Sequence, residues 1–269
     1  MVHGFLITMT ISMLMPLYFA FVVASQADAL SVMQGVRFLP AGHFIENISA
    51  VLIHQTLTLG DKPVWVLLLN SALMASIVAL GKVLLALLAA FSLVYLEMPF
   101  KKMVFLIIFS TLVLPIEVRV LTTFQVAVSL NWLNSMSGLT IPLMASATAI
   151  FLFRQFFHTV PPELLDAAKL DGAGPIAFFW HILWPLSRAQ IGGLFVILFV
   201  FGWNQYLWPL VITTSFDKAS IVMGIKYLAN VTDQIPQWHY IMCVALLALL
   251  PPSLMILIVS RRLEKGLIH

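Results

Sequence analysis

Most of this 269-residue sequence is divided into apolar runs that are long enough to cross a lipid bilayer. A transmembrane helix needs about 20 mostly apolar residues. Six stretches meet that requirement: 5–24, 64–96, 103–124, 138–157, 191–213 and 237–260. Because lipid offers no partners for backbone N–H and C=O groups, such long spans must be helical. The sequence predicts an all-α integral membrane protein, one transmembrane domain of six helices over residues 1–269.

Composition excludes a water-soluble globule and argues against a nucleic-acid partner. Hydrophobic residues make up 61% of the chain and charged residues 9%, against roughly 45–50% and about 25% in soluble domains. The net charge is +3, and the basic residues form no stripe that would follow a phosphate backbone. The single cysteine, Cys243, lies inside an apolar run and supports neither a disulfide nor a metal cluster.

Two segments allow more than one interpretation. The run 5–24 has the length of a spanning helix but also of the apolar part of a cleaved signal peptide; it lacks a convincing small-residue cleavage site, which favours the span. The mixed segment 25–63 is expected to be a large extramembrane loop with a short interfacial helix around Phe44 to Leu57.

The longest polar interruption, 161–186, predicts two short helices folded over a glycine turn. Pro162 suits the first turn of a helix, where its missing N–H costs nothing. Gly172 suits the left-handed position that ends a helix. A second helix is expected from Ile176 to Leu183, with Pro185 ending it. An ordinary amphipathic linker between spans is the alternative.

The same segment resembles the EAA loop of ABC importer permeases. The matching residues, at the family's spacing, are Asp166-Ala167-Ala168, Asp171-Gly172-Ala173, Phe179, Ile182 and Pro185-Leu186. Two positions depart from the family pattern: Asp166 stands where Glu is usual, and Ala189 where many members have Pro. The resemblance implies that the loop 158–190 couples the permease to an ATPase through residues 166–168 and 171–173.

Charged side chains within the apolar runs are candidates for the translocation pathway. Lys82 lies well inside the second run, and Glu117 and Arg119 lie in the third beside Pro115. A proline in a span frees carbonyls that protein or a water-filled cavity must cover. Arg119 has the charge that a phosphate ester would require. For Lys82 we favour a structural partnership with a carbonyl or carboxylate at a helix contact, and for Glu117 and Arg119 the outer water interface is the alternative.

A second pathway candidate is the aromatic and amide cluster Trp203, Asn204, Gln205 and Tyr206. Rings that stack and amides that hydrogen-bond suit a hydroxylated ligand. An aromatic belt at the lipid interface is the alternative interpretation. The run that continues to Pro209 also resembles the corresponding stretch of carbohydrate importer permeases.

The distribution of Lys and Arg predicts the orientation. Eight lie on the side of the coupling loop: Lys101, Lys102, Arg154, Lys169, Arg188, Arg261, Arg262 and Lys265. Five lie on the other side, in longer loops: Arg37, Lys62, Arg119, Lys218 and Lys226. The positive-inside rule then places the coupling loop and both termini in the cytoplasm and the loop 25–63 in the periplasm.

The sequence contains no phosphate-binding loop, no His-Glu-x-x-His and no Gly-x-Ser-x-Gly. We therefore expect a bacterial inner-membrane permease rather than an enzyme, with no metal or cofactor of its own and with ATP and Mg bound by partner subunits. A secondary transporter would need intramembrane carboxylates, of which Glu117 is the one clear example.

The family resemblance, to carbohydrate-type ABC importer permeases of the maltose-permease class, covers nearly the whole chain. It implies a complex of this subunit with a second permease, two ATPase subunits and a periplasmic substrate-binding protein. Within the family the likeness is strongest to glycerol-3-phosphate importers. This implies sn-glycerol-3-phosphate or a related glycerophosphodiester as substrate, with a neutral sugar or polyol as the alternative.

Overall fold

The computed structural model describes residues 2–33, 35, 38–53, 62–112, 116–230 and 235–267, with the backbone alone at 33, 116, 117 and 260–267. Every regular element in these ranges is a helix, in agreement with the predicted all-α class. The chain forms two compact units. The first unit comprises Met1–Ala72 and Gln205–Ser253, and the second comprises Leu73–Asn204 and Leu254–His269.

The first unit contains helices from both ends of the sequence. Its elements are α1 (Val2–Ala24), α2 (Ala29–Met33), α3 (Phe44–Ile53), the start of α4 (Val64–Tyr95), α13 (Leu207–Ile212), η3 (Phe216–Lys218), α14 (Ile221–Ala229) and most of α15 (Trp238–Leu267). Helix α1 is apolar on all sides, and almost all of its side chains up to Tyr18 are exposed. A fully apolar and uncovered helix is stable in lipid and not in water.

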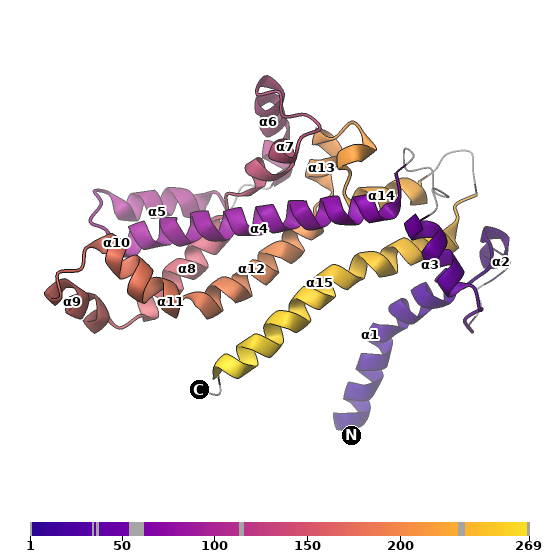
Figure 1. Ribbon diagram of the computed structural model, residues 1–269, viewed down its shortest axis with the longest axis horizontal. Coiled ribbons are helices and arrows are strands. Elements are labelled where there is room, and N and C mark those ends of the chain that lie inside the picture. Colours follow the sequence, from indigo (N-terminus) through magenta and orange to yellow (C-terminus); the bar gives the residue numbers. More distant parts are fainter. Residues whose placement is uncertain are drawn as a thin grey trace. The chain divides into compact units, whose positions relative to one another are not determined.

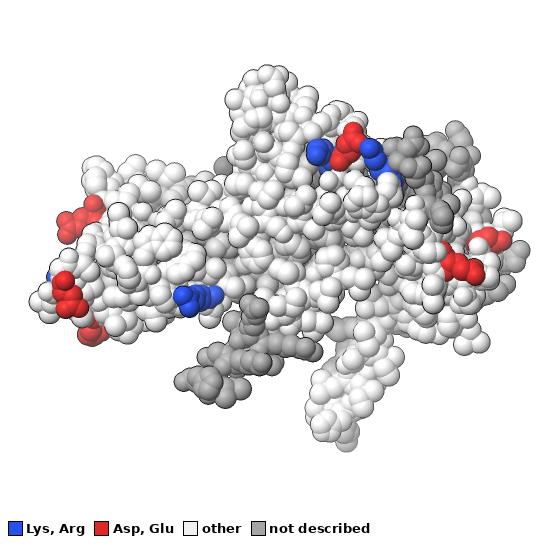
Figure 2. All heavy atoms as spheres, in the orientation of Figure 1, with Lys and Arg blue, Asp and Glu red and all other residues white. Residues whose placement is uncertain are grey.

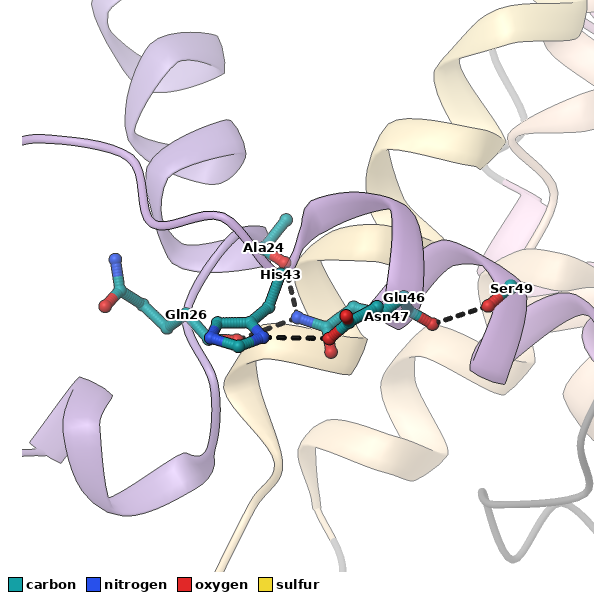
Figure 3. Close-up of polar contacts among 6 residues, drawn as sticks. All are labelled: Ala24, Gln26, His43, Glu46, Asn47 and Ser49. Atoms are coloured by element: carbon teal, nitrogen blue, oxygen red, sulfur yellow. Dashed lines mark hydrogen bonds and ion pairs between the residues drawn. The ribbon is translucent and has the colours of Figure 1, made fainter.

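The end of α1 is fastened to α3 by one buried amide. The side chain of Asn47 donates hydrogen bonds to the carbonyls of Ala24, at 2.9 Å, and Gln26, at 2.7 Å (Figure 3). These carbonyls lie where a helix ends and leaves its acceptors unpaired. The predicted helix around Phe44 to Leu57 is confirmed as far as Ile53, and residues 54–61 lie outside the described part of the chain.

Asn70 and Ser71, at the start of α4, hold the segment that leads into α14. The Asn70 amide donates to the carbonyls of Asp217, at 2.9 Å, and Ala219, at 3.3 Å. The Ser71 hydroxyl oxygen accepts the N–H of Ile221 at 2.7 Å. Because both side chains are buried, these bonds satisfy groups that water cannot reach.

The second unit is a helical bundle built along the rest of α4. Its other elements are α5 (Lys101–Ser110), α6 (Ile116–Ser129), α7 (Met136–Thr140), η1 (Ile141–Leu143), α8 (Ala147–Thr159), α9 (Pro162–Leu170), α10 (Pro175–Phe178), η2 (Phe179–Leu183), α11 (Trp184–Leu186) and α12 (Arg188–Trp203). Helix α8 packs against α5 and α12. In Figure 1 the short helices α9, α10 and α11 lie at the end of this bundle where α4 stops.

Several predicted spans are broken where hydropathy gives no sign of a break. Helices α1, α4 and Trp238–Val259 of α15 are long and apolar enough to cross a membrane as single helices. The predicted span 138–157 is instead a pair, Met136–Leu143 and Ala147–Thr159, bent by 49°. Ser146 explains this break, because its side chain accepts the N–H of Ala149 and so caps a new helix.

The predicted spans 103–124 and 191–213 are also not single helices. Helix α5 ends at Ser110 and α6 begins at Ile116, while Pro115 lies outside the described residues. In the other run, α12 ends at Trp203 and α13 begins at Leu207. The apolar runs therefore predicted the membrane class correctly but not the continuity of these helices.

Candidate functional site

The segment 158–190, predicted from the sequence to be a coupling loop, begins with a short helix that has a tightly folded end. Helix α9 begins at Pro162 and carries Glu163 in its first turn, where a carboxylate is favoured by the helix dipole. At its end, Ala173 N–H bonds to the Ala168 carbonyl at 2.8 Å and Gly172 N–H to the Lys169 carbonyl at 3.0 Å. This pair of bonds is a Schellman motif. Gly172 has φ 74° there, which confirms the predicted left-handed stop.

Helix α9 presents an uncovered surface of mixed charge and apolar character. Asp166, Ala167 and Lys169 are exposed, and Leu170 is 90% exposed, while Ala168 is buried. Figure 2 shows acidic side chains gathered at the α9 end of the bundle, whereas most of the visible face carries no charge. The exposed apolar and acidic groups suit contact with another protein at the water boundary.

The second half of the loop departs from the predicted helix in one respect. Helical turns run from Pro175 through Leu186, so Pro185 does not end them as predicted. The five residues Phe179–Leu183 form a π-helix, and Pro185 lies in the first turn of the α11 segment after it. A π-helical turn changes the hydrogen-bond register, so that the missing N–H of the proline is accommodated without breaking the chain direction.

Aromatic side chains join this half of the loop to the bundle. Phe178 and Phe179 are buried. The ring of Phe178 lies 5.1 Å from that of Tyr95, and the ring of Phe179 lies 5.0 Å from that of Phe91. The Tyr95 hydroxyl donates a hydrogen bond of 3.1 Å to the Phe157 carbonyl. Edge-to-face ring packing is directional, so these contacts fix the position of this segment against the ends of α4 and α8.

The loop also continues directly into α12. Residues Pro175–Leu186 and α12 meet at a bend of 71°. Ser187 lies at this bend, fully buried, and its hydroxyl donates to the Leu183 carbonyl at 2.6 Å. The bend is therefore held by a satisfied internal hydrogen bond and connects the loop covalently to a bundle helix.

A second feature of this unit is a cavity of about 330 Å³ between α4, α6, α8 and α12. Its lining comprises Lys82, Thr111, Leu112, Arg119, Ala145, Ser146, Ala147, Thr148, Ile197, Leu198 and Phe201. Lys82 is 6% exposed, and its ammonium lies 4.1 Å from the centre of the Phe201 ring. No ion pair of Lys82 with a described residue is found, and the side chain of Glu117 lies outside the described part of the structure, so the favoured partnership of Lys82 stays a prediction.

The pathway candidates chosen from the sequence do not all meet at this cavity. Arg119 lines it, whereas the side chain of Glu117 lies outside the described part of the structure. Trp203 is buried and stacks on Phe199 at 5.9 Å, and Asn204 follows it as the exposed C-cap of α12.

The remaining two candidates belong to the first unit. Gln205 is half-buried, and Tyr206 lines a separate hollow of about 300 Å³ with Lys226 and Tyr227 of α14.

Sequence reasoning missed Ser146 and Thr148 as lining residues of the cavity in the second unit. Their signal was the run of small residues from 145 to 149, which was interpreted as a helix-packing surface.

The chain is similar to permeases of binding-protein-dependent importers over nearly its whole length. The family model described as "Binding-protein-dependent transport system inner membrane component" matches residues 72–269. The sn-glycerol-3-phosphate transport system permease protein UgpE of Yersinia pestis (strain Antiqua) is 43% identical over 266 residues, covering 99% of this chain and 94% of that protein. UgpE of Escherichia coli K12 has the same identity and coverage.

The fold has a counterpart among solved structures. A chain of a bacterial ABC transporter involved in the import of the acidic polysaccharide alginate superposes with a TM-score of 0.80. The alignment covers 97% of this chain and 94% of that one, at 18% sequence identity. At that identity the similarity establishes the fold and carries no information about substrate.

Proposed function

This chain belongs to the family of binding-protein-dependent transport system inner membrane components, and we propose that it serves the import of sn-glycerol-3-phosphate. It is a multi-pass inner-membrane permease of an ABC importer, which decides against an ion-coupled secondary transporter. The proposed substrate rests on the 43% identity to UgpE over 99% of the chain. The partners are a second permease, two ATPase subunits that bind ATP and Mg, and a periplasmic binding protein.

The coupling loop is the part of this chain that meets an ATPase subunit. Helix α9 offers Asp166 and the adjacent exposed residues Ala167 and Leu170 as the contact surface. Asp166 pairs with a basic group or N–H of the ATPase, and Gly172 keeps α9 folded at a fixed angle to α10. Motion of the ATPase moves α9, and the rings of Phe178 and Phe179 carry that displacement to α4.

The cavity of the second unit, which Lys82 and Arg119 line, forms part of the translocation pathway. Arg119 lines the cavity and supplies a charge that a phosphate ester requires. Glu117 and the segment Trp203–Tyr206 remain pathway predictions. The coupling loop and both termini face the cytoplasm, as the excess of Lys and Arg on that side favours.

The substrate is tested with the assembled importer in proteoliposomes. Uptake and ligand-stimulated ATP hydrolysis are measured for glycerol 3-phosphate, a glycerophosphodiester, glycerol and a neutral disaccharide. The periplasmic binding protein of the importer is present in each assay and is first incubated with the compound tested. We expect stimulation by glycerol 3-phosphate and none by glycerol or the disaccharide. Stimulation by the neutral sugar alone would replace the proposed substrate by the alternative and leave the permease assignment intact.

The coupling role is tested in the same preparation with a matched pair of glycine variants. Gly172→Ala forces a side chain into a left-handed conformation, whereas Gly174 has φ −72° and open space around it. We expect Gly172→Ala and Asp166→Asn to reduce both uptake and stimulated ATP hydrolysis, and Gly174→Ala and Asp166→Glu to preserve them. If Asp166→Asn and Gly172→Ala show the same uptake and stimulated ATP hydrolysis as the parent, the coupling role is wrong.

A further inference from the structure

The described lining of the cavity in the second unit brings together two cations and no acidic side chain. Lys82 comes from α4 and Arg119 from α6, and both line the same cavity. Neither makes an ion pair with a described residue, and none of the described lining residues is acidic. Positive charge that no described residue compensates is unfavourable in a low-dielectric site, so this arrangement favours a bound anion.

The helix that begins at the cavity adds hydrogen-bond donors of the same kind. Ala147 and Thr148 are the first two residues of α8 and line the cavity, and N–H groups at these positions have no acceptor within their own helix. The positive end of the helix dipole therefore lies at the cavity. This is independent of the two side-chain charges, because it comes from the backbone.

Hydroxyl groups complete the set of donors. The Ser146 oxygen accepts the Ala149 N–H, so its own O–H remains available to donate. Thr148 presents a second hydroxyl on an exposed side chain. Thr111 is different, since its hydroxyl already donates to the Ile108 carbonyl. Two cations, a helix N-terminus and two hydroxyls match the several acceptor oxygens and the double charge of a phosphate monoester.

Lys82 is the residue that distinguishes this cavity from a general basic surface. It is 6% exposed, and its ammonium lies 4.1 Å from the centre of the Phe201 ring. An intramembrane lysine without a carboxylate is costly to keep charged. Contact with Phe201 positions the ammonium at the cavity wall and leaves its N–H donors without a protein acceptor among the described residues.

We propose that this cavity is the site at which the permease holds the phosphate group of its substrate, with Lys82 and Arg119 as the two cationic contacts and the start of α8 as the third. The inference rests on the proposed function for the identity of the substrate. It assigns the recognition of the phosphate to this chain in addition to the binding protein. The same chemistry would also accept the phosphate of an anionic lipid headgroup, which the experiment separates.

The first measurement is uptake of glycerol 3-phosphate by the assembled importer in proteoliposomes. Lys82→Gln and Arg119→Gln are each expected to lower uptake at subsaturating substrate by about tenfold or more, as loss of a charge-assisted contact does. Lys82→Arg is expected to restore most of it, and Lys102→Gln, an exposed lysine of the same unit, to have no effect. Assembly is verified by copurification of all subunits.

The second measurement reports the potential of the cavity without any transport. Ala145→Cys places a thiol on an exposed lining residue, while the native Cys243 is buried. In nanodiscs of neutral lipid, we expect an anionic thiosulfonate to react roughly tenfold faster than a cationic one of similar size, since a positive site concentrates anions. The double variant Lys82→Gln/Arg119→Gln should bring the two rates together, and glycerol 3-phosphate should slow the anionic reagent.

The outcomes separate the inference from the proposed function. If the parent complex imports glycerol 3-phosphate but the double variant keeps both its uptake and its labelling ratio, the phosphate site is wrong and the proposed function stands. If labelling is anion-selective but the parent imports no phosphate ester, the proposed substrate is wrong. If nanodiscs with phosphatidylglycerol abolish the ratio and glycerol 3-phosphate gives no protection, the cavity is a lipid headgroup site, which overturns the inference.

Discussion

Gly202 of α12 lies directly against the backbone of Ala75 in α4. A Cβ atom at position 202 would lie 3.0 Å from the Ala75 Cα and 3.4 Å from its carbonyl oxygen. Small residues at helix contacts let two backbones approach closely in a membrane protein. Because the obstructing atoms belong to a main chain and not to the end of a side chain, they cannot move aside without separating the two helices.

This contact predicts that Gly202→Val destabilises the bundle. Overpacking of this kind costs about 1–3 kcal/mol, so the variant should melt at a lower temperature in detergent and lose material to aggregation. Gly193→Ala in the same helix is the control, because no atom lies within 4 Å of its added Cβ. Equal melting temperatures for the parent and Gly202→Val would show that the helices are not this close in the folded protein.

The link between α4 and α14 predicts a second, local effect. Ser71→Ala removes the acceptor of the buried Ile221 N–H. A buried donor without an acceptor costs about 1–3 kcal/mol. Limited proteolysis should then cut the segment 214–220 faster than in the parent. Ser92→Ala is the control on the same helix, because its hydroxyl serves only a carbonyl of its own helix at an exposed position; equal cleavage of both variants would contradict the role of Ser71.

The ion pair of Lys62 and Asp217 predicts a small loss of stability in acid. Their side chains meet at 2.8 Å, and the hydrogen bond and charge of Lys62 hold the pKa of Asp217 below its ordinary value of 3.8. A carboxyl whose pKa is lowered by folding stabilises the folded state above its unfolded pKa, and this contribution disappears as the pH falls through the lowered value. Asp217→Asn should therefore lower the melting temperature slightly at pH 7, and the difference from the parent should vanish near pH 2.

The effect at Asp217 is expected to be small because the pair is exposed to water. High salt at pH 7 should reduce the difference between parent and variant further. A difference that stays constant from pH 7 to pH 2 would show that the amide substitution acts through something other than this charge.

How much the sequence could predict depends on how local each feature is. Helix α9 was predicted correctly at both ends, because Pro162 and Gly172 act within their own turn. The π-helix before Pro185 was missed, since a change of hydrogen-bond register leaves no distinct pattern in apolar residues. The break at Ser146 was missed because the surrounding residues are uniformly small.

The cavity could be predicted only in part. Arg119 was identified by its charge within an apolar run. Its proximity to Lys82 and Thr148 depends on the packing of α4, α6 and α8, which no spacing in the sequence determines. The ring contact between Tyr95 and Phe178 was missed for the same reason, because these residues lie on separate elements that meet only in the folded bundle.

If α9 of this permease contacts an ATPase subunit, cysteine cross-linking in the intact importer will detect that contact. Leu170→Cys, at the most exposed position of α9, is paired with cysteines scanned along the surface of the ATPase and treated with a short bifunctional thiol reagent. We expect a cross-linked permease–ATPase product whose yield changes on addition of ATP. Absence of that product from Leu170→Cys, in a complex that still imports substrate, would contradict that contact.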